Sequence, residues 1–299
     1  MSKLKVHLLI LPRWFAIPFF ATAVILGSIL AGGSFSDINL WLGLIAVLLI
    51  MAGGHSFNSF LDYSWTGLDK GEVEDRSAEK SYTGGQNLLA RGMVSPHEVL
   101  INALSWYVVA LVPLFLLSIW STWWVLPAGL LGMSITFWYS KAKFNWTHEL
   151  SLAVGTGPFP ILLGMFAVNS SPNWIDGLIV GGPFAIIVSF GGLALDEWPD
   201  AEANLKKGVK SIAFKVWEYG IDLSTYLMLW VALLYVYQVF LITIGLLAPL
   251  TGLTFIVCPL FIANLVMLKG NFEKAVPPFV LIGFAYVMLL VVGQAIGGG

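Results

Sequence analysis

Long uncharged segments alternate with short polar ones along the whole chain. The uncharged segments are residues 14–36, 38–61, 99–140, 150–175, 177–195, 223–268 and 275–299. Because about 20 apolar residues suffice for one helix to cross a bilayer, the two longest segments have room for two helices each. Trp120 to Thr122 divide the first of these, and Gly245 to Pro249 divide the second. The pattern predicts an all-α, polytopic membrane protein with nine transmembrane helices.

The composition agrees with this class. Of 299 residues, 58% are hydrophobic and 11% are charged, and the mean hydropathy is +0.85. Soluble domains contain about 25% charged residues. The single cysteine, Cys258, lies in an apolar segment, which excludes a disulfide and a cysteine-based metal site. We expect one transmembrane domain over residues 1–299, a bilayer as its environment, and no nucleic-acid partner.

Charged residues gather on one side of the predicted membrane. With an odd number of spans and the N-terminus inside, the inside segments are residues 1–14, 62–98, 140–149, 196–222 and 269–275. These segments contain all 15 basic residues, as the positive-inside rule requires: Lys3, Lys5, Arg13, Lys70, Arg76, Lys80, Arg91, Lys141, Lys143, Lys206, Lys207, Lys210, Lys215, Lys269 and Lys274. Of 17 acidic residues, only Asp37 and Asp176 lie outside. We therefore expect a multi-pass cell-membrane protein with a cytoplasmic N-terminus and an external C-terminus.

Two acidic clusters follow apolar segments on the inner side. Residues four apart share one face of a helix, and both clusters contain such a pair. Oxygen ligands without His or Cys favour a hard cation, above all Mg²⁺, which proteins hold through a few carboxylates and substrate phosphate. Two clusters would hold two ions against one diphosphate. The candidate metal ligands are Asn58, Asp62, Asp69, Asp196 and Asp200.

Basic residues on the same side suit a phosphorylated substrate. Arg76, Lys143 and Lys210, together with Tyr139, would neutralise phosphate oxygens. The apolar bundle would accommodate a long hydrocarbon tail, so head and tail together describe a polyprenyl diphosphate. The inner polar loops, residues 62–98 and 196–222, would cap the site.

Other interpretations of these polar residues are simpler. A single acid at a helix end is often just interfacial charge, but ionisable groups beside membrane helices tend to be functional, and here two pairs recur. Lys206 and Lys207 would enforce topology. His55 would form a hydrogen bond within the bundle rather than bind metal, and Glu149 would orient local backbone or a base.

Several of these motifs together resemble the UbiA family of intramembrane prenyltransferases. The first family motif is matched at Asn58 and Asp62, with Ser59 replacing its usual second residue, and the third acid stands at Asp69 instead of Thr66. This wider spacing is similar to that of the menaquinone-type branch. Further matches are Asp75-Arg76, Tyr139-x3-Lys143, Asp196-x3-Asp200, and GVKSIA at 208–213, which places Lys210 at a family arginine.

The resemblance implies a nine-helix fold and a mechanism. Mg²⁺ and the basic residues would bind the diphosphate and stabilise its departure, and an acceptor would capture the resulting allylic carbocation. Exclusion of water would protect this cation from hydrolysis. The implied catalytic residues are Asp62, Tyr139, Lys143 and Asp196, and the implied diphosphate-binding residues are Asn58, Arg76, Lys143 and Lys210.

The acceptor is open at this point. An aromatic quinone precursor is the first expectation, and a glycerol-phosphate lipid, as in the archaeal ether-lipid branch, is the main alternative. A CDP-alcohol phosphotransferase is disfavoured because the chain lacks a D-G-x2-A-R run. A transporter would have charges in mid-span, whereas four of the predicted helices have none.

Overall fold

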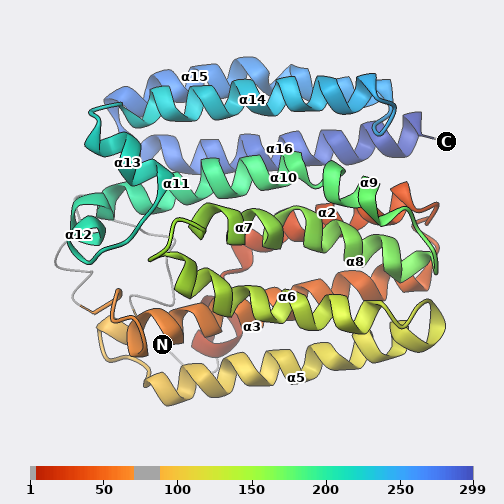
Figure 1. Ribbon diagram of the computed structural model, residues 1–299, viewed down its shortest axis with the longest axis horizontal. Coiled ribbons are helices and arrows are strands. Elements are labelled where there is room, and N and C mark those ends of the chain that lie inside the picture. The colour runs from red at the N-terminus through yellow and green to blue at the C-terminus, as the bar shows by residue number, and fades with distance from the viewer. Residues whose placement is uncertain (1–4, 71–87, 299) are drawn as a thin grey trace.

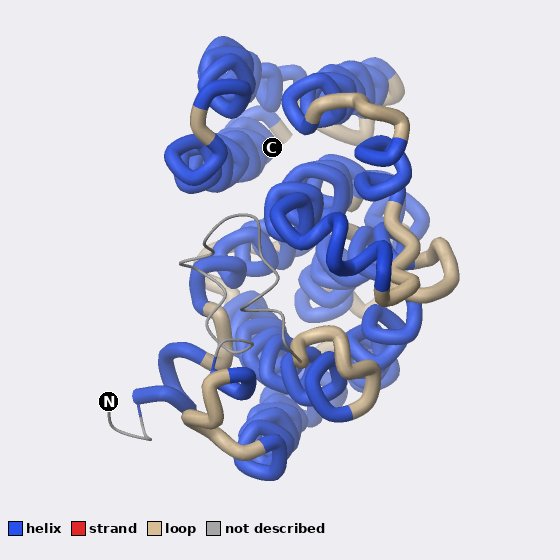
Figure 2. The backbone as a smooth tube through the Cα atoms, turned by 90° about the vertical axis from the view of Figure 1, so that its left-hand side faces the viewer, coloured by secondary structure: helices blue, strands red, loops and turns tan. Residues whose placement is uncertain are grey.

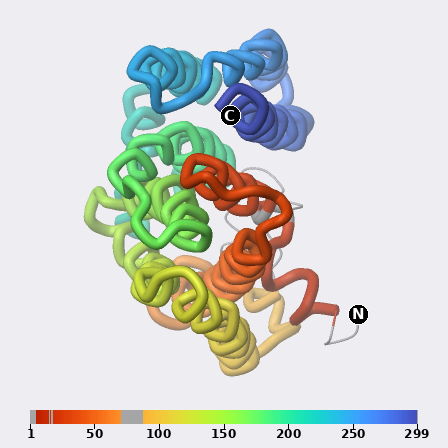
Figure 3. The backbone as a smooth tube through the Cα atoms, turned by 90° about the vertical axis from the view of Figure 1, so that its right-hand side faces the viewer, coloured from red at the N-terminus to blue at the C-terminus, as the bar shows by residue number. Residues whose placement is uncertain are grey.

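The computed structural model describes residues 5–70 and 88–298, and over these ranges it contains helices and turns but no strand. The helices lie in rows with their long axes roughly aligned (Figure 1). Helices α14 to α16 lie at one end of the stack and α3, α5 and α6 at the other, with α2 and α7 to α11 between them (Figures 1 to 3). The all-α class predicted from the sequence is confirmed.

The helices of the first half are α2 (Ile17–Leu30), α3 (Ile38–Ser64), α5 (Pro96–Trp120), α6 (Val125–Ala142), α7 (His148–Thr156) and α8 (Pro158–Val168), preceded by the short η1 (Val6–Ile10) and η2 (Trp14–Ala16). A bent run follows: α9 (Trp174–Val180), α10 (Gly182–Ala185), η3 (Ile186–Gly192), α11 (Leu193–Glu197), η4 (Trp198–Asp200) and α12 (Ala201–Lys206). The last helices are α13 (Ile212–Glu218), α14 (Leu223–Thr243), η5 (Pro249–Val257), α15 (Cys258–Gly270) and α16 (Phe272–Gly297).

Seven helical runs in the described part of the chain are long and apolar enough to cross a membrane. They are Ile38–Ser64, Pro96–Trp120, His148–Val168, Trp174–Lys206, Leu223–Thr243, Pro249–Gly270 and Phe272–Gly297. The predicted count of nine is therefore not confirmed. The two remaining candidates are short: α2 has 14 residues, and α6 has 18 and ends on a polar, lysine-containing turn.

Both divisions that the sequence predicted within long apolar segments are present. Helix α5 ends at Trp120 and α6 begins at Val125. Helix α14 ends at Thr243, and the chain turns at Gly245, whose φ of 77° is a conformation that glycine adopts without steric cost. The chain then re-enters the bundle at Pro249.

Small residues let the central helices approach closely. A Cβ atom added to Gly27 of α2 would lie 2.1 Å from the Ile161 carbonyl oxygen of α8, and one added to Gly164 of α8 would lie 2.1 Å from the Val24 carbonyl oxygen of α2. Such contacts between small residues are the usual means of packing membrane helices, because lipid provides no hydrophobic drive for helix association. They fix α2 and α8 as the centre of the stack.

The bent run from Trp174 to Lys206 changes its helical type twice. A π-helical segment, Ile186–Gly192, precedes α11, and a 3-10 turn, Trp198–Asp200, follows it. Pro199 lies within that turn and cannot donate the backbone hydrogen bond of a regular helix. π-helical segments are often found at functional sites because they redirect the side chains that follow. Here the acidic cluster follows directly.

Candidate active site

The ends of α3, α6 and α11 lie at the left of Figure 1. Residues at or beside these ends line a small polar cavity. Its volume is about 30 Å³. The residues around it come from segments far apart in the sequence: Arg13, Asn58, Leu68, Asp69, Tyr139, Lys143, Asp196, Glu197, Asp200, Asn204 and Val209. The two acidic clusters predicted from the sequence thus border one cavity.

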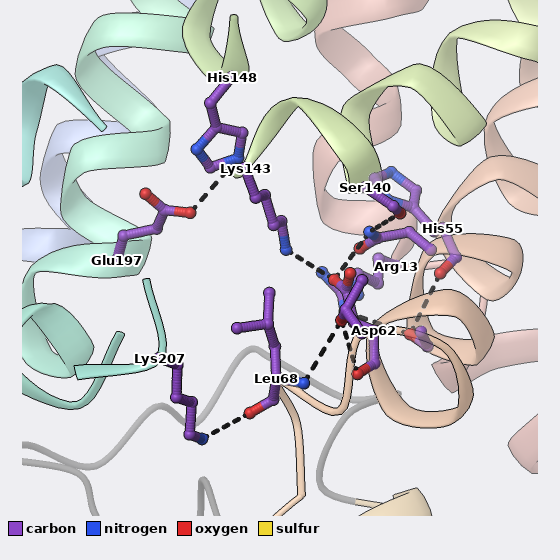
Figure 4. A network of polar contacts seen from close by, with 12 residues as sticks. Arg13, His55, Asp62, Leu68, Ser140, Lys143, His148, Glu197 and Lys207 are labelled. Carbon is purple, nitrogen blue, oxygen red and sulfur yellow. Dashed lines mark hydrogen bonds and ion pairs between the residues drawn. The ribbon is translucent and has the colours of Figure 1, made fainter. Parts of the chain in front are cut away.

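Asp62 is the centre of the first cluster and is completely buried. Its Oδ2 atom accepts hydrogen bonds from Lys143 Nζ at 2.6 Å and from Asn58 Nδ2 at 2.8 Å (Figure 4). Asn58 Nδ2 also lies 3.3 Å from Ser140 Oγ. The other carboxylate oxygen, Oδ1, is buried and has no hydrogen-bond partner among the described residues. Since unpaired buried oxygens are rare, Oδ1 is a position where a ligand is to be expected.

The exit from α3 folds back and brings Asp69 to the same cavity. Gly67 has a φ of 71°, which turns the chain sharply. The Asp69 N–H then lies 3.3 Å from the Asp62 carbonyl oxygen, and Thr66 Oγ1 donates to the same oxygen at 3.1 Å. The Asp69 side chain is only 2% exposed. Glycine at position 67 thus explains why the third acid can lie seven residues beyond Asp62 and still face the cavity.

Lys143 follows α6 and lies between the two clusters. Its ammonium nitrogen is 5.0 Å from the centre of the Tyr139 ring, one helical turn earlier. Burial lowers the pKa of Lys143, but Asp62, Tyr139 and Glu197 together raise it well above its ordinary value. The lysine is therefore a buried positive charge held by surrounding negative charge.

The second cluster lies across the cavity from the first. Asp196, Glu197 and Asp200 all border the cavity. Glu197 Oε1 lies 3.5 Å from Nε2 of His148, a completely buried residue at the start of α7 (Figure 4). The His148 ring lies 4.8 Å from the Tyr139 ring. The acidic cluster of α11 and η4 is thereby connected to Tyr139 and Lys143.

Two polar contacts fix the loop after α12 and the turn after α3. Glu149 Oε1 accepts hydrogen bonds from Ser211 Oγ at 2.8 Å and from the Ile212 N–H at 2.5 Å. Glu149 therefore holds backbone that lies 63 residues further along the chain, whereas the sequence suggested local backbone or a base. Lys207 Nζ donates to the Leu68 carbonyl oxygen at 2.7 Å. Lys207, which the sequence assigned to topology alone, thus connects the two loops.

The structure does not bring every predicted residue to the cavity. The Lys210 side chain is exposed and is not among the cavity residues, although its backbone N–H donates to the Lys143 carbonyl oxygen at 2.6 Å. Arg76 lies outside the described residues. The hydrogen bond expected for His55 is not found at Nε2, which is buried and has no partner among the described residues.

Sequence reasoning missed four residues at or beside the cavity: Arg13, His148, Glu197 and Asn204. Arg13 has a positive φ of 51° and its Nη2 lies 3.3 Å from Ser59 Oγ. Its position before an apolar segment gave no sign of a contact 46 residues away. Glu197 is adjacent to Asp196 in the sequence, so the DEWPD run was the one signal that pointed to it.

The cavity fits a hard divalent cation in its donor chemistry, because carboxylate and amide side chains line it. Asp62 does not line the cavity itself but is hydrogen-bonded to Asn58 and Lys143, which do. Among the described residues, however, no three His, Cys, Asp or Glu side chains are already gathered as a metal-binding group. The ammonium group of Lys143 lies against Asp62 instead.

The ends of several apolar helices thus bring carboxylates and buried basic groups together around one cavity. Residues 19–288 match the UbiA prenyltransferase family, and the chain belongs to this family. It is a multi-pass membrane protein and a prenyltransferase. Family membership confirms the resemblance drawn from the sequence.

The individual relatives have low sequence identity to this chain. The chain is 26% identical over 242 residues to a 1,4-dihydroxy-2-naphthoate octaprenyltransferase of Bacillus subtilis, covering 79% of this chain and 73% of the relative. The fold is similar to a UbiA homologue from Aeropyrum pernix K1, with a TM-score of 0.69, 17% identity and coverage of 95% and 97% of the two chains. It is also similar to an Archaeoglobus fulgidus homologue bound to DMAPP and Mg²⁺, with a TM-score of 0.55, 16% identity and coverage of 96% and 99%.

Proposed function

We propose that this protein transfers a prenyl group from a polyprenyl diphosphate to an aromatic quinone precursor, in a reaction that depends on Mg²⁺. The observation that carries the proposal is the Asp62 carboxylate. One of its oxygens accepts from Asn58 and Lys143, which line the same cavity as the second acidic cluster, and the other is buried without a partner among the described residues. An unpaired carboxylate oxygen and a charged lysine at one cavity suit a metal-bound diphosphate.

Asn58, Asp62, Asp69, Asp196 and Asp200 would hold the metal. When bound, Mg²⁺ would supply the positive charge that neutralises the diphosphate and makes it a better leaving group. The Archaeoglobus fulgidus homologue bound to DMAPP and Mg²⁺ supports this assignment through its common fold.

Lys143 would donate hydrogen bonds to the diphosphate, because it lines the cavity and its pKa is raised well above its ordinary value by the surrounding negative charge. Arg13, which also lines the cavity, would add a second positive charge. Arg76 and Lys210 stay proposed diphosphate ligands from the loops. For Lys210 this requires a change of side-chain orientation, since the side chain is exposed.

The reaction would begin with cleavage of the bond between the first prenyl carbon and the diphosphate oxygen, and the bonding electrons would leave with the diphosphate. An acceptor ring carbon would then bond to the allylic cation, and the proton of that ring carbon would pass to the released diphosphate. Tyr139 and Glu197 both line the cavity. The ring face of Tyr139 and the negative charge of Glu197 would stabilise this cation.

The cavity would be closed by apolar contacts between the loops. Leu68 packs with Ala201, Val209 and Phe214 in one buried cluster. This loop cluster joins the exit of α3 to the segment after α11, and it would keep water from the cation. It supports the proposal that residues 62–98 and 196–222 cap the site of a single domain.

The acceptor assignment is supported by the similarity to the Bacillus subtilis naphthoate octaprenyltransferase. The alternative acceptor, a glycerol-phosphate lipid, is supported by similarity of fold to a digeranylgeranylglyceryl phosphate synthase, with a TM-score of 0.60 and 16% identity. Sequence similarity over most of the chain favours the aromatic acceptor. The placement of all basic residues in the inner segments supports a cytoplasmic site and N-terminus.

The test is an assay of the purified protein with Mg²⁺ and a labelled prenyl diphosphate. Dihydroxynaphthoate, hydroxybenzoate and geranylgeranylglyceryl phosphate are offered in parallel. Prenylated dihydroxynaphthoate is the expected product. Transfer to the glycerol phosphate alone would move the protein to the ether-lipid branch, and no transfer to any acceptor would contradict the proposed reaction.

A further inference from the structure

The contact between Lys143 and Asp62 is the shortest ion pair in the described part of the chain. Lys143 Nζ lies 2.6 Å from Asp62 Oδ2, and the two side chains are 9% and 0% exposed. Asn58 donates to the same oxygen at 2.8 Å. The carboxylate of the first aspartate motif is therefore already neutralised by a cation that belongs to the chain (Figure 4).

We infer that Lys143 occupies the cation position at Asp62, so that the metal ion and the diphosphate bind this protein cooperatively. The inference rests on the proposed function and deepens it. A divalent ion at Asp62 would stand next to the Lys143 ammonium group, and two positive charges repel strongly where the surroundings are poorly polarisable. Asp62 is completely buried against Lys143, which leaves little room for a metal ion beside the ammonium group.

A metal ion at Asp62 Oδ1 would repel Lys143 and displace it from its contact with Oδ2. A buried ammonium group that loses its partner carries a large desolvation penalty. The diphosphate removes this penalty, because its oxygens can accept hydrogen bonds from Lys143 while the Asp62 carboxylate binds the metal. Metal without diphosphate would bind weakly, and each ligand would raise the affinity for the other by the same factor.

The arrangement of the acidic side chains agrees with the proposed transfer of Lys143 from Asp62 to the diphosphate. No three acidic or histidine side chains form a metal-binding group in the ranges that the structure describes, although four candidate oxygen ligands border one cavity. Lys143 is thus a positioning residue for the metal as well as a ligand for the diphosphate. Its removal should leave Asp62 free to bind a metal ion alone.

The experiment measures Mn²⁺ binding by electron paramagnetic resonance, which detects the free ion, on the full chain in detergent. Wild type and Lys143→Met are titrated with and without inorganic pyrophosphate. Lys143→Met should bind Mn²⁺ alone roughly tenfold more tightly than wild type, within the usual range of coupling between sites. Pyrophosphate should raise the Mn²⁺ affinity of wild type more than that of the variant. Chelation by pyrophosphate in solution is common to both proteins and cancels in this ratio.

Lys141→Met is the matched control for the loss of one positive charge nearby. Lys141 is exposed and its ammonium nitrogen lies 3.9 Å from the centre of the Trp65 ring. Its substitution should change Mn²⁺ affinity by less than about twofold, since exposed charges are screened. Lys143→Arg, which keeps the charge, should bind Mn²⁺ alone as weakly as wild type.

Unchanged or weaker Mn²⁺ binding in Lys143→Met would overturn the inference, as would an equal gain in Lys141→Met. If Lys143→Met does not fold, wild type still decides: Mn²⁺ bound equally tightly with and without pyrophosphate, after correction for chelation, contradicts cooperative binding. Failure of the proposed function looks different, because it would abolish prenyl transfer by wild type while the cooperativity of Mn²⁺ and pyrophosphate persisted.

Discussion

Two buried polar clusters lie at different places in this bundle, and they differ in how fully their atoms are paired. The C-terminal cluster surrounds Gln238, which is completely buried in α14. Its amide nitrogen donates to the Thr251 carbonyl oxygen at 2.8 Å, and its amide oxygen accepts from Thr254 Oγ1 and Tyr286 Oη, both at 2.8 Å. In the Asp62 cluster, by contrast, a carboxylate oxygen has no partner in the described chain.

The difference in pairing indicates that the Gln238 cluster stabilises the fold, whereas the Asp62 cluster suits a binding site. The Gln238 network provides hydrogen-bond partners for polar groups of η5, a 3-10 helix of 9 residues. Hydrogen-bond geometry is poorer in a 3-10 helix than in an α-helix, so its polar groups need such partners. Gln294 adds to it by accepting from the Ala248 N–H at 2.8 Å. A paired network of this kind holds a fold together. The Asp62 cluster instead keeps an unsatisfied oxygen next to a cavity, which fits a site that is completed by its ligands.

Loss of an acidic side chain at the cavity should have the largest effect. Asp196→Ala should lower prenyl transfer by about a thousandfold or more, since removal of one electrostatic stabiliser of a transition state can cost this much. Asp196 is partly exposed, so folding should be unaffected. Transfer is measured with labelled prenyl diphosphate at ordinary Mg²⁺, and folding by thermal unfolding in detergent. Activity close to wild type would count heavily against the site.

Asp62→Ala should abolish transfer as well, but at a cost in stability. It leaves the Lys143 ammonium group buried without its partner, and such changes destabilise by roughly 3–5 kcal/mol. Adding Lys143→Met to Asp62→Ala should restore most of the thermal stability and none of the activity. A double variant as unstable as the single one would show that the ion pair is not what Asp62 contributes to the fold.

The Gln238 cluster should give the opposite result. Gln238→Ala removes three hydrogen bonds of 2.8 Å, and we expect a loss of roughly 2–4 kcal/mol in the free energy of unfolding, because buried partners are left unpaired. The folded fraction should retain its rate of transfer within about twofold. Tyr237→Phe is the control, since it removes a single neighbouring bond, from Tyr237 Oη to the Ile179 carbonyl oxygen. A specific loss of activity in Gln238→Ala would remove the contrast between the clusters.

Glu197→Gln tests a residue that the sequence did not single out. The substitution keeps the size of the side chain and removes a negative charge beside the cavity, so the turnover number should fall roughly tenfold to a hundredfold. The KM for the prenyl diphosphate should change little, because the ground-state substrate is itself an anion. Steady-state kinetics separate the two constants. An increase in KM with unchanged turnover would assign Glu197 to binding instead.

The sequence predicted what depends on local spacing. Apolar segment lengths gave the helices, and four-residue spacing placed Asn58 and Asp62 on one face, where their side chains now form a hydrogen bond. What depends on distant contacts was not predictable. Arg13 reaches Ser59 over 46 residues, and His148 meets Glu197 only because α7 packs beside the bent run that ends in α12. The count of nine membrane helices is not confirmed for a different reason, since α2 and α6, with 14 and 18 residues, are the shortest of the predicted spans.

The smallest expected effect concerns two adjacent lysines after α11. Lys207 Nζ donates to the Leu68 carbonyl oxygen at 2.7 Å and so connects the two loops, whereas the neighbouring Lys206 forms an exposed pair with Glu202. Exposed pairs contribute little, so Lys206→Met should be neutral. Lys207→Met should loosen the loops and admit water, which raises the share of prenyl alcohol among the products by roughly two- to fivefold. Chromatography of the labelled products measures this share in both variants, and equal shares would leave the Lys207 contact without a role in closing the cavity.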